Sequence, residues 1–213
     1  MSGPLASPGT APSEARRAAS SVAAMAAAAA GGVRAFGEIV AGLKPGKHRR
    51  SGEPVWRNSY YEGQIEDRVW RPIAGGSIRA AARFRGAVLK AAREIERKTR
   101  RARQDVQPGT RNGFIGQVGL DVLEALWHFV DFATGRLEPA IATLAEWTGH
   151  SYSAVHAALN RLRRAGFLHW MRRSRPTGRT GEAGPQVEQI PNAYALLIPA
   201  DVEKLVRHLF TPP

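Results

Sequence analysis

The 213-residue sequence contains no cysteine. Disulfide bonds, thiolate zinc sites and cysteine nucleophiles are therefore all excluded. The sequence also lacks any apolar run close to the roughly 18 residues of a transmembrane helix, so we predict a protein that does not use a membrane as its partner. Acidic residues are few: 18 Asp and Glu stand against 31 Lys and Arg, which gives a formal net charge of +13. An excess of this size indicates a polyanionic partner.

Signatures of catalysis are also scarce. The segment "GLKPGKH" at 42–48 looks like a phosphate-binding loop but has no Ser or Thr where that loop holds magnesium. Tyr60 and Tyr61 could suggest a nucleophile that nicks DNA, yet that chemistry needs a metal, and the six histidines occur singly along the chain. No pair of carboxylates stands out as an acid and a base. We therefore predict that the protein is not an enzyme and uses no metal and no cofactor.

The first 32 residues are mainly Ala, Ser, Gly and Pro, with scarcely a large side chain. Such a segment cannot offset the entropy lost on ordering, so we predict a disordered tail over 1–32. Its two arginines followed by alanines make a poor secretion signal, because alanine is only weakly apolar. We predict a cytoplasmic protein, associated with the nucleoid or a plasmid, whose true start could be Met1 or Met25.

Residues 33–75 contain short apolar clusters separated by proline, glycine and basic residues. This pattern predicts an irregular segment that packs on another part of the chain. The segment also carries Glu62, Glu66 and Asp67, which could cover basic residues of the helix that follows.

Residues 76–106 are rich in helix formers, contain no proline and open with Ser77 as a candidate N-cap. They predict a long helix with an apolar seam that repeats every seven residues, at Ala81, Val88 and Ile95. A homodimer through the helix at 76–104 would be one use of that seam. The other faces predict a secondary basic surface, formed by Arg79, Arg83, Lys90, Arg93, Arg97, Arg100 and Arg101. Proline and glycines at 107–113 predict a domain boundary.

The remaining chain, residues 113–213, has the pattern of a compact domain. Helical spacing, end signals and alternation predict helices at 118–135, 137–149 and 151–166, strands at 167–175 and 192–198, and a last helix at 200–209. Two helices joined by a short turn through Gly149 and followed by a hairpin are typical of a winged helix-turn-helix. We therefore predict a mainly α fold, in which a winged helix-turn-helix domain with a C-terminal helix follows the long basic helix.

The helix at 151–166 carries the strongest functional signal. Its inward face is apolar, whereas short hydrogen-bonding side chains occupy the opposite face, as reading of the DNA major groove requires. The predicted base-reading residues are Tyr152, Ser153, His156 and Asn160.

Seven arginines and no acidic residue lie between Arg161 and Gly181. Uncompensated charge of this density predicts contacts with phosphate groups and a basic wing. The predicted backbone and wing residues are Arg163, Arg164, Arg172, Arg173, Arg175 and Arg179. Trp170, within the same stretch, is predicted to pack in the core.

Three tracts carry a resemblance to a known family: "TGRLEPAIATLA", "SYSAVHAALNRLRRAGFL" and the "NAY" that opens the second strand. Over about residues 108–200, the sequence resembles the helix-turn-helix region of replication proteins from alphaproteobacterial plasmids and related phages. The resemblance implies a winged helix that binds double-stranded DNA at an origin or operator.

Three functions are compatible with these observations. The first is initiation or copy control of replication of a plasmid or phage element by sequence-specific DNA binding. The second is a transcriptional repressor with the same fold. The third gives the main role to the basic helix at 76–104, as an arm that binds nucleic acid without sequence preference.

Overall fold

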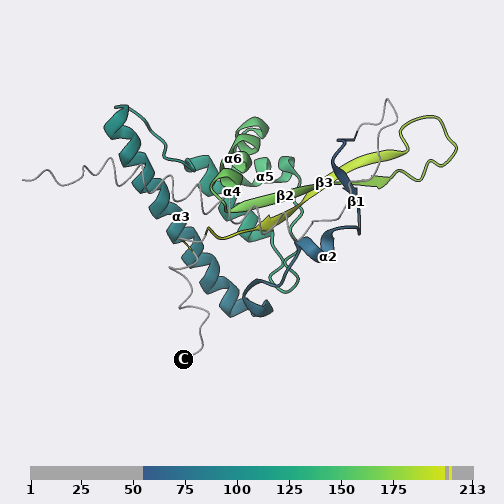
Figure 1. Ribbon diagram of the computed structural model, residues 1–213, viewed down its shortest axis with the longest axis horizontal. Coiled ribbons are helices and arrows are strands. Elements are labelled where there is room, and N and C mark those ends of the chain that lie inside the picture. The colour runs from purple at the N-terminus through teal and green to yellow at the C-terminus, as the bar shows by residue number, and fades with distance from the viewer. Residues whose placement is uncertain (1–54, 200–201, 203–213) are drawn as a thin grey trace, which may run out of the picture.

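The computed structural model describes residues 55–199 and residue 202. This part of the chain is mixed α/β, with five α-helices and a three-stranded sheet (Figure 1). The elements are β1 (Ser59–Tyr61), α2 (Glu66–Val69), the 3-10 turn η1 (Ile73–Gly76), α3 (Ile78–Val106), α4 (Gln117–Phe129), α5 (Ile141–Thr148), α6 (Tyr152–Arg164), β2 (Leu168–Pro176) and β3 (Val187–Leu196). The tail predicted over 1–32 lies outside the described residues, as does the helix predicted at 200–209 except for Val202, which is helical and buried.

Helix α3 confirms the long helix predicted from sequence, and its start is set by the predicted cap. The Ser77 hydroxyl accepts a hydrogen bond from the Ala80 N–H at 3.4 Å, which satisfies one backbone donor of the first turn. The helix stops at Gln107, one residue before Pro108, because a residue that precedes proline is disfavoured in helical geometry.

The apolar seam of α3 is buried against the rest of its own chain. Ala81, Phe84, Val88 and Ala92 are all less than a tenth exposed, and Phe84 packs edge-on against Trp127 of α4 with ring centroids 5.7 Å apart. The seam that suggested a homodimer is therefore occupied within the chain. The same packing joins α3 to the core of the following domain, so the 107–113 loop separates two helices that share one core.

Glu96 anchors the loop between α3 and α4. Its buried carboxylate accepts hydrogen bonds from the N–H groups of Gly113, Ile115 and Gly116, the last two at 3.0 and 2.8 Å. These donors belong to the backbone that leads into α4, where a negative charge is favoured by the helix dipole. One acidic residue of α3 thus fixes where the next helix begins.

Helix α4 ends six residues earlier than predicted, at Phe129 instead of Gly135. Asp131 builds a turn there: its carboxylate accepts hydrogen bonds from the Ala133 N–H at 2.9 Å and the Thr134 hydroxyl at 2.6 Å. Gly135 closes the turn with a φ of 78°, and a side chain there would collide with the backbone of Arg71. The Asp131 side chain gives the backbone hydrogen bonds that compete with those of a continued helix, and the helical periodicity of the sequence does not reveal this competition.

Helices α5 and α6 meet at the predicted tight turn. Gly149 ends α5 in the left-handed conformation, with φ 68° and ψ 16°, which a residue with a side chain rarely adopts. Ser151 then caps α6, accepting a hydrogen bond from the Ala154 N–H at 3.3 Å. The predicted inward face of α6 is confirmed, because Val155, Ala158, Leu159 and Leu162 are all buried.

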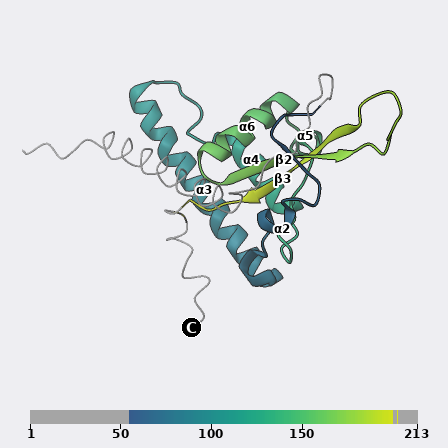
Figure 2. The ribbon, with the colours of Figure 1, turned by 45° about the vertical axis from the view of Figure 1, so that its right-hand side comes forward.

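The sheet contains more strand than the sequence suggested. Strands β2 and β3 form the predicted antiparallel hairpin, which projects beyond the helices (Figure 2). Strand β3 begins at Val187, five residues before the predicted start. Strand β1, from the segment predicted as irregular, pairs in parallel with β2, so that Ser59 faces Arg172 in the register. On the other edge, the Tyr194 N–H of β3 donates to the Leu137 carbonyl at 2.8 Å.

Candidate nucleic-acid interface

The outer face of α6 presents three of the four predicted base-reading residues to solvent. Tyr152 is 59% exposed, and Ser153 and His156 are exposed beside it. Asn160 is half-buried, and its amide donates a hydrogen bond to the His156 carbonyl within the same helix at 3.0 Å. The exposed set is therefore concentrated in the first turns of the helix.

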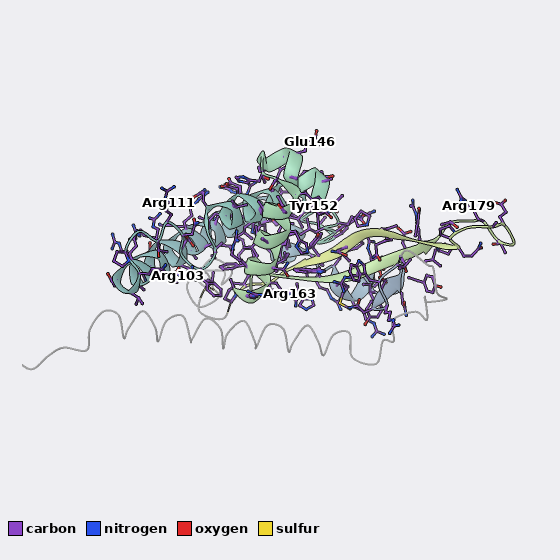
Figure 3. The ribbon with its side chains drawn as sticks, turned by 90° about the horizontal axis from the view of Figure 1, so that it is seen from above. Arg103, Arg111, Glu146, Tyr152, Arg163 and Arg179 are labelled. Carbon is purple, nitrogen blue, oxygen red and sulfur yellow. The ribbon has the colours of Figure 1, made fainter. Side chains whose placement is uncertain are left out.

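Arginines continue from the last turn of α6. Arg163 and Arg164 are exposed and form no salt bridge with any described residue. The Arg163 guanidinium lies over the ring of Trp170, 4.8 Å from its centroid, which holds the cation in place without neutralising it. Figure 3 shows Tyr152 and Arg163 near opposite ends of α6. Trp170, predicted to lie in the core, is half-buried and packs against the core's edge.

Arg172 lies at an irregularity of the hairpin. The register between β2 and β3 shifts between Met171 and Arg173, and a bulge of this kind turns a side chain out of its regular direction. Its guanidinium lies 4.8 Å from the ring centroid of Trp56 and donates a hydrogen bond to the Asn58 side chain at 2.8 Å. Like Arg163, it is held by neutral groups and keeps its charge.

Arg173 must be removed from the predicted set of DNA contacts. Its side chain is 2% exposed and forms salt bridges with Glu66 of α2, at 2.8 Å, and with Glu138. Burial by itself raises the pKa of Glu66, but the hydrogen bond from Arg173 and that from the Ile65 N–H outweigh burial and leave this pKa below its usual value. Glu66 of the acidic segment therefore neutralises an arginine of strand β2. The sequence had suggested instead that this segment covers the long basic helix.

The two remaining arginines of the predicted wing, Arg175 and Arg179, differ in how far their charge is neutralised. Arg175 is half-exposed and is paired with Glu188 across the hairpin at 2.6 Å, so little of its charge is available. Arg179 is exposed near the tip of the hairpin loop (Figure 3) and forms no salt bridge within the described part of the chain. The described arginines that keep their charge available here are Arg163, Arg164 and Arg179, which are exposed, and Arg172, which is half-buried.

A groove of about 570 Å³ lies between the start of α6 and the hairpin. From α6 it is lined by Tyr152, Ser153 and His156, and from the hairpin by Arg172 and Asn192, among others. Asn160 does not line it. Sequence reasoning missed Trp56, which also lines the groove, because its contact with Gln189 spans 133 positions of the chain.

A smaller cavity of about 180 Å³ shares Trp170 and Arg172 with the lining of this groove and is also lined by His169. Burial and the nearby Arg163 guanidinium lower the pKa of His169 to about 4, since both disfavour the protonated ring. His169 is therefore neutral near pH 7 and adds no charge to the surface.

The predicted basic face of α3 is exposed at all seven positions. Arg93 pairs with Glu124 of α4 at 3.1 Å, and Arg97 pairs with Glu94. The other members form no salt bridge with a described residue; they are Arg79, Arg83, Lys90, Arg100 and Arg101. The helix thus offers a second region of available positive charge.

Within residues 55–199, no cluster of three or more His, Asp or Glu side chains is arranged to hold a metal ion. No helix in the described part of the chain has the length and apolar character needed to cross a bilayer.

The sequence is similar to a protein from Rhizobium radiobacter named "Replicating protein", with 35% identity over 96 residues, which are 45% of this chain. The match covers 33% of that protein, so this chain spans about a third of its relative's length. No protein family matches the sequence, and no solved structure matches it either.

Proposed function

We propose that this chain binds double-stranded DNA sequence-specifically through a winged helix-turn-helix, with α6 in the major groove and the β2–β3 hairpin as the wing. The observation that carries the proposal is the outer face of α6. It exposes Tyr152, Ser153 and His156 in its first turns and, in its last turn, Arg163 and Arg164, which no described carboxylate neutralises.

The order and geometry of the elements support this interpretation. The chain order is helix α4, then a segment that is hydrogen-bonded to β3 through Leu137, then helix α5. A left-handed turn at Gly149 leads into helix α6, and the β2–β3 hairpin follows. In helix-turn-helix proteins the second helix of the pair enters the major groove, and its first residues contact base edges. Tyr152, Ser153 and His156 lie in that part of α6.

The residues divide into two kinds of DNA contact. Hydroxyl and imidazole groups can hydrogen-bond to base edges, which gives sequence preference. Guanidinium groups at Arg163, Arg164, Arg172 and Arg179 would contact phosphates, which fixes position but reads no sequence. Binding should therefore weaken steeply as salt concentration rises.

The proposed biological role is replication of a plasmid or phage element, either by initiation or by copy control. The similarity to a protein named for replication supports this role. A transcriptional repressor would use the same DNA contacts, since winged helices serve both purposes. The exposed charge of α3 supports a further contribution, in which this helix contacts phosphates of the same or a neighbouring DNA segment without reading sequence.

DNA binding is tested by selecting duplex fragments from a random library with the full-length protein and sequencing those retained. A shared motif is expected, and it should disappear in a Ser153→Ala/His156→Ala variant. The matched control is Arg100→Ala/Arg101→Ala on α3, which should weaken binding to all fragments and leave the motif unchanged. Equal retention of every fragment by the wild type would exclude sequence-specific reading.

The role in replication is tested separately. The gene with its flanking DNA is placed on a plasmid that lacks its own origin, and persistence of that plasmid in a suitable bacterial host is measured. Persistence that requires intact His156 supports initiation. Loss of the plasmid together with repression of a linked reporter gene supports the repressor instead.

A further inference from the structure

The groove between α6 and the hairpin has a composition unlike that of a simple phosphate-binding surface. Several of its lining side chains are aromatic: Trp56, Tyr152, Trp170 and Tyr194. No acidic residue is among the lining residues, and one of them, Arg172, carries a full positive charge. Its volume of about 570 Å³ is within the range of about 300–1,000 Å³ that is usual for sites that enclose small organic molecules.

Two aromatic side chains at this groove are exposed to an unusual degree. Trp56 is 60% exposed and Tyr152 is 59% exposed, although burying an aromatic ring is strongly favourable. Tyr152 comes from α6 and Trp56 from the segment before β1, so the groove is bordered by open ring surfaces from two separate elements.

Trp56 is held at the groove by specific contacts. Its backbone N–H donates to the Gln189 side-chain oxygen at 3.1 Å, and the Ser59 hydroxyl donates to the same oxygen at 3.1 Å. The Gln189 amide in turn donates to the Arg173 carbonyl at 2.6 Å. The pairing of β1 with β2 and these hydrogen bonds fix the backbone at Trp56. Its ring therefore projects from an ordered segment.

Arg172 is arranged to contact an anion at the same place. It covers one side of the Trp56 ring, is oriented by Asn58 and has no salt bridge with any described residue. Because Trp56 is 60% exposed even with Arg172 beside it, part of its ring surface is open to stack on another planar group.

We propose that this groove binds single-stranded DNA, with an unpaired base stacked on Trp56 and an adjacent phosphate at Arg172. Proteins that bind single strands combine aromatic side chains, on which bases stack, with positive charge that follows the backbone. Within a duplex each base face is covered by its neighbours, so an open tryptophan ring can stack fully only on an unpaired base. This single-strand site goes beyond the proposed duplex reading, although Tyr152, Ser153 and His156 border both.

The test measures binding of a short labelled oligodeoxythymidine by fluorescence anisotropy, with full-length protein. Trp56→Ala should weaken binding about tenfold to a hundredfold, as expected for loss of one base–aromatic stack. Trp56→Phe, which keeps a ring, should stay within about threefold of the wild type. The matched control is Trp147→Ala, because Trp147 is also exposed, at 45%, but does not line the groove. It should change binding less than about twofold.

A second oligonucleotide separates stacking from attraction of phosphate to a basic protein. On an abasic strand of equal length, which has phosphates but no bases, wild type and Trp56→Ala should bind equally. The proposal would be overturned if Trp56→Ala and Trp147→Ala weakened binding to oligodeoxythymidine equally. It would also be overturned if Trp56→Ala weakened binding to the abasic strand as much as binding to oligodeoxythymidine.

Duplex binding distinguishes this proposal from the preceding one. Trp56→Ala should leave the affinity for the selected duplex motif within about threefold of the wild type, and an equal loss on both DNA forms would assign Trp56 to the duplex site and overturn the single-strand site. If the library yields no duplex motif while oligodeoxythymidine binding depends on Trp56, the duplex proposal fails and the single-strand site stands.

Discussion

Arg172 and Arg173 are neighbours in sequence, yet they occupy opposite environments on strand β2. Arg172 lies at the bulge, stacked on Trp56 and hydrogen-bonded to Asn58, with its charge available. Arg173 is 2% exposed between two carboxylates, Glu66 and Glu138. One face of the hairpin is therefore suited to an external anion, while the other uses the same type of side chain to fasten α2 to the sheet.

The comparison shows that a count of arginines does not measure the charge that a surface offers. A buried arginine with internal carboxylate partners contributes to structural order, whereas an arginine held by neutral groups keeps its charge available to an external anion. The predictions below test this division, beginning with the largest expected effect.

Replacing Arg173 by methionine should destabilise the fold strongly. The change leaves the Glu66 carboxylate buried beside an apolar side chain, and breaking a buried ion pair in this way costs about 3–5 kcal/mol. The free energy of unfolding, measured with urea, should fall by that amount. Arg172→Met is the control and should change it by less than about 1 kcal/mol. Similar losses in both variants would contradict the division between the two faces.

In DNA binding, Arg172→Met should have a larger effect than Arg173→Met, which is the reverse of their order in stability. Arg172→Met should weaken binding to duplex DNA by about 1–2 kcal/mol and reduce the salt slope by about one, as loss of one phosphate contact does. Affinity is measured at several salt concentrations below the unfolding temperature. Arg173→Met, assayed where it remains folded, should keep the wild-type slope. An unchanged slope in Arg172→Met would show that this guanidinium contacts no phosphate.

His169 should make stability depend on pH. The pKa of His169 is about 4 in the folded chain, whereas the ordinary value of 6.5 applies to the unfolded chain. Between pH 4 and 6.5, His169 is therefore protonated in the unfolded chain and neutral in the folded one. Stability should therefore fall as pH drops from 6.5 to 4, by on the order of 1–2 kcal/mol for a half-buried ring. Urea unfolding of His169→Gln should show a flatter profile over this interval. A profile parallel to that of the wild type would exclude His169 as its origin.

The paired charges of α3 should matter least. Arg97 and Glu94 form an exposed pair one turn apart, and pairs of this kind contribute little to stability because water and salt screen them. Arg97→Met should lower the free energy of unfolding only slightly in low salt, and the difference should vanish in high salt. A loss as large as that of Arg173→Met would mean that the surface of α3 has a structural role comparable to that of Arg173.

Features that depend on neighbouring residues were predictable from the sequence. The length of α3, its cap at Ser77, the left-handed turn at Gly149 and the buried face of α6 all follow from local periodicity and cap chemistry. The exposed positions of Tyr152, Ser153 and His156 belong to this group too, because they are the other face of the same helix.

Features that depend on distant residues were not predictable. Strand β1 has only three residues and exists because β2 offers an edge to pair with. The predicted end of α4 was wrong because Asp131 forms its own turn. The position of Trp56 at the groove depends on a hydrogen bond to Gln189, which is far along the chain. In each case a single long-range or side-chain contact outweighed the local pattern.

The sequence by itself determined that the chain has two amphipathic basic helices, a helix–turn–helix order and a large excess of positive charge. Only the tertiary structure decided which charges remain available and which residues border the groove. The physical reason is that helix periodicity and capping are set within a few residues, whereas neutralisation and burial depend on which segments, distant in sequence, pack together.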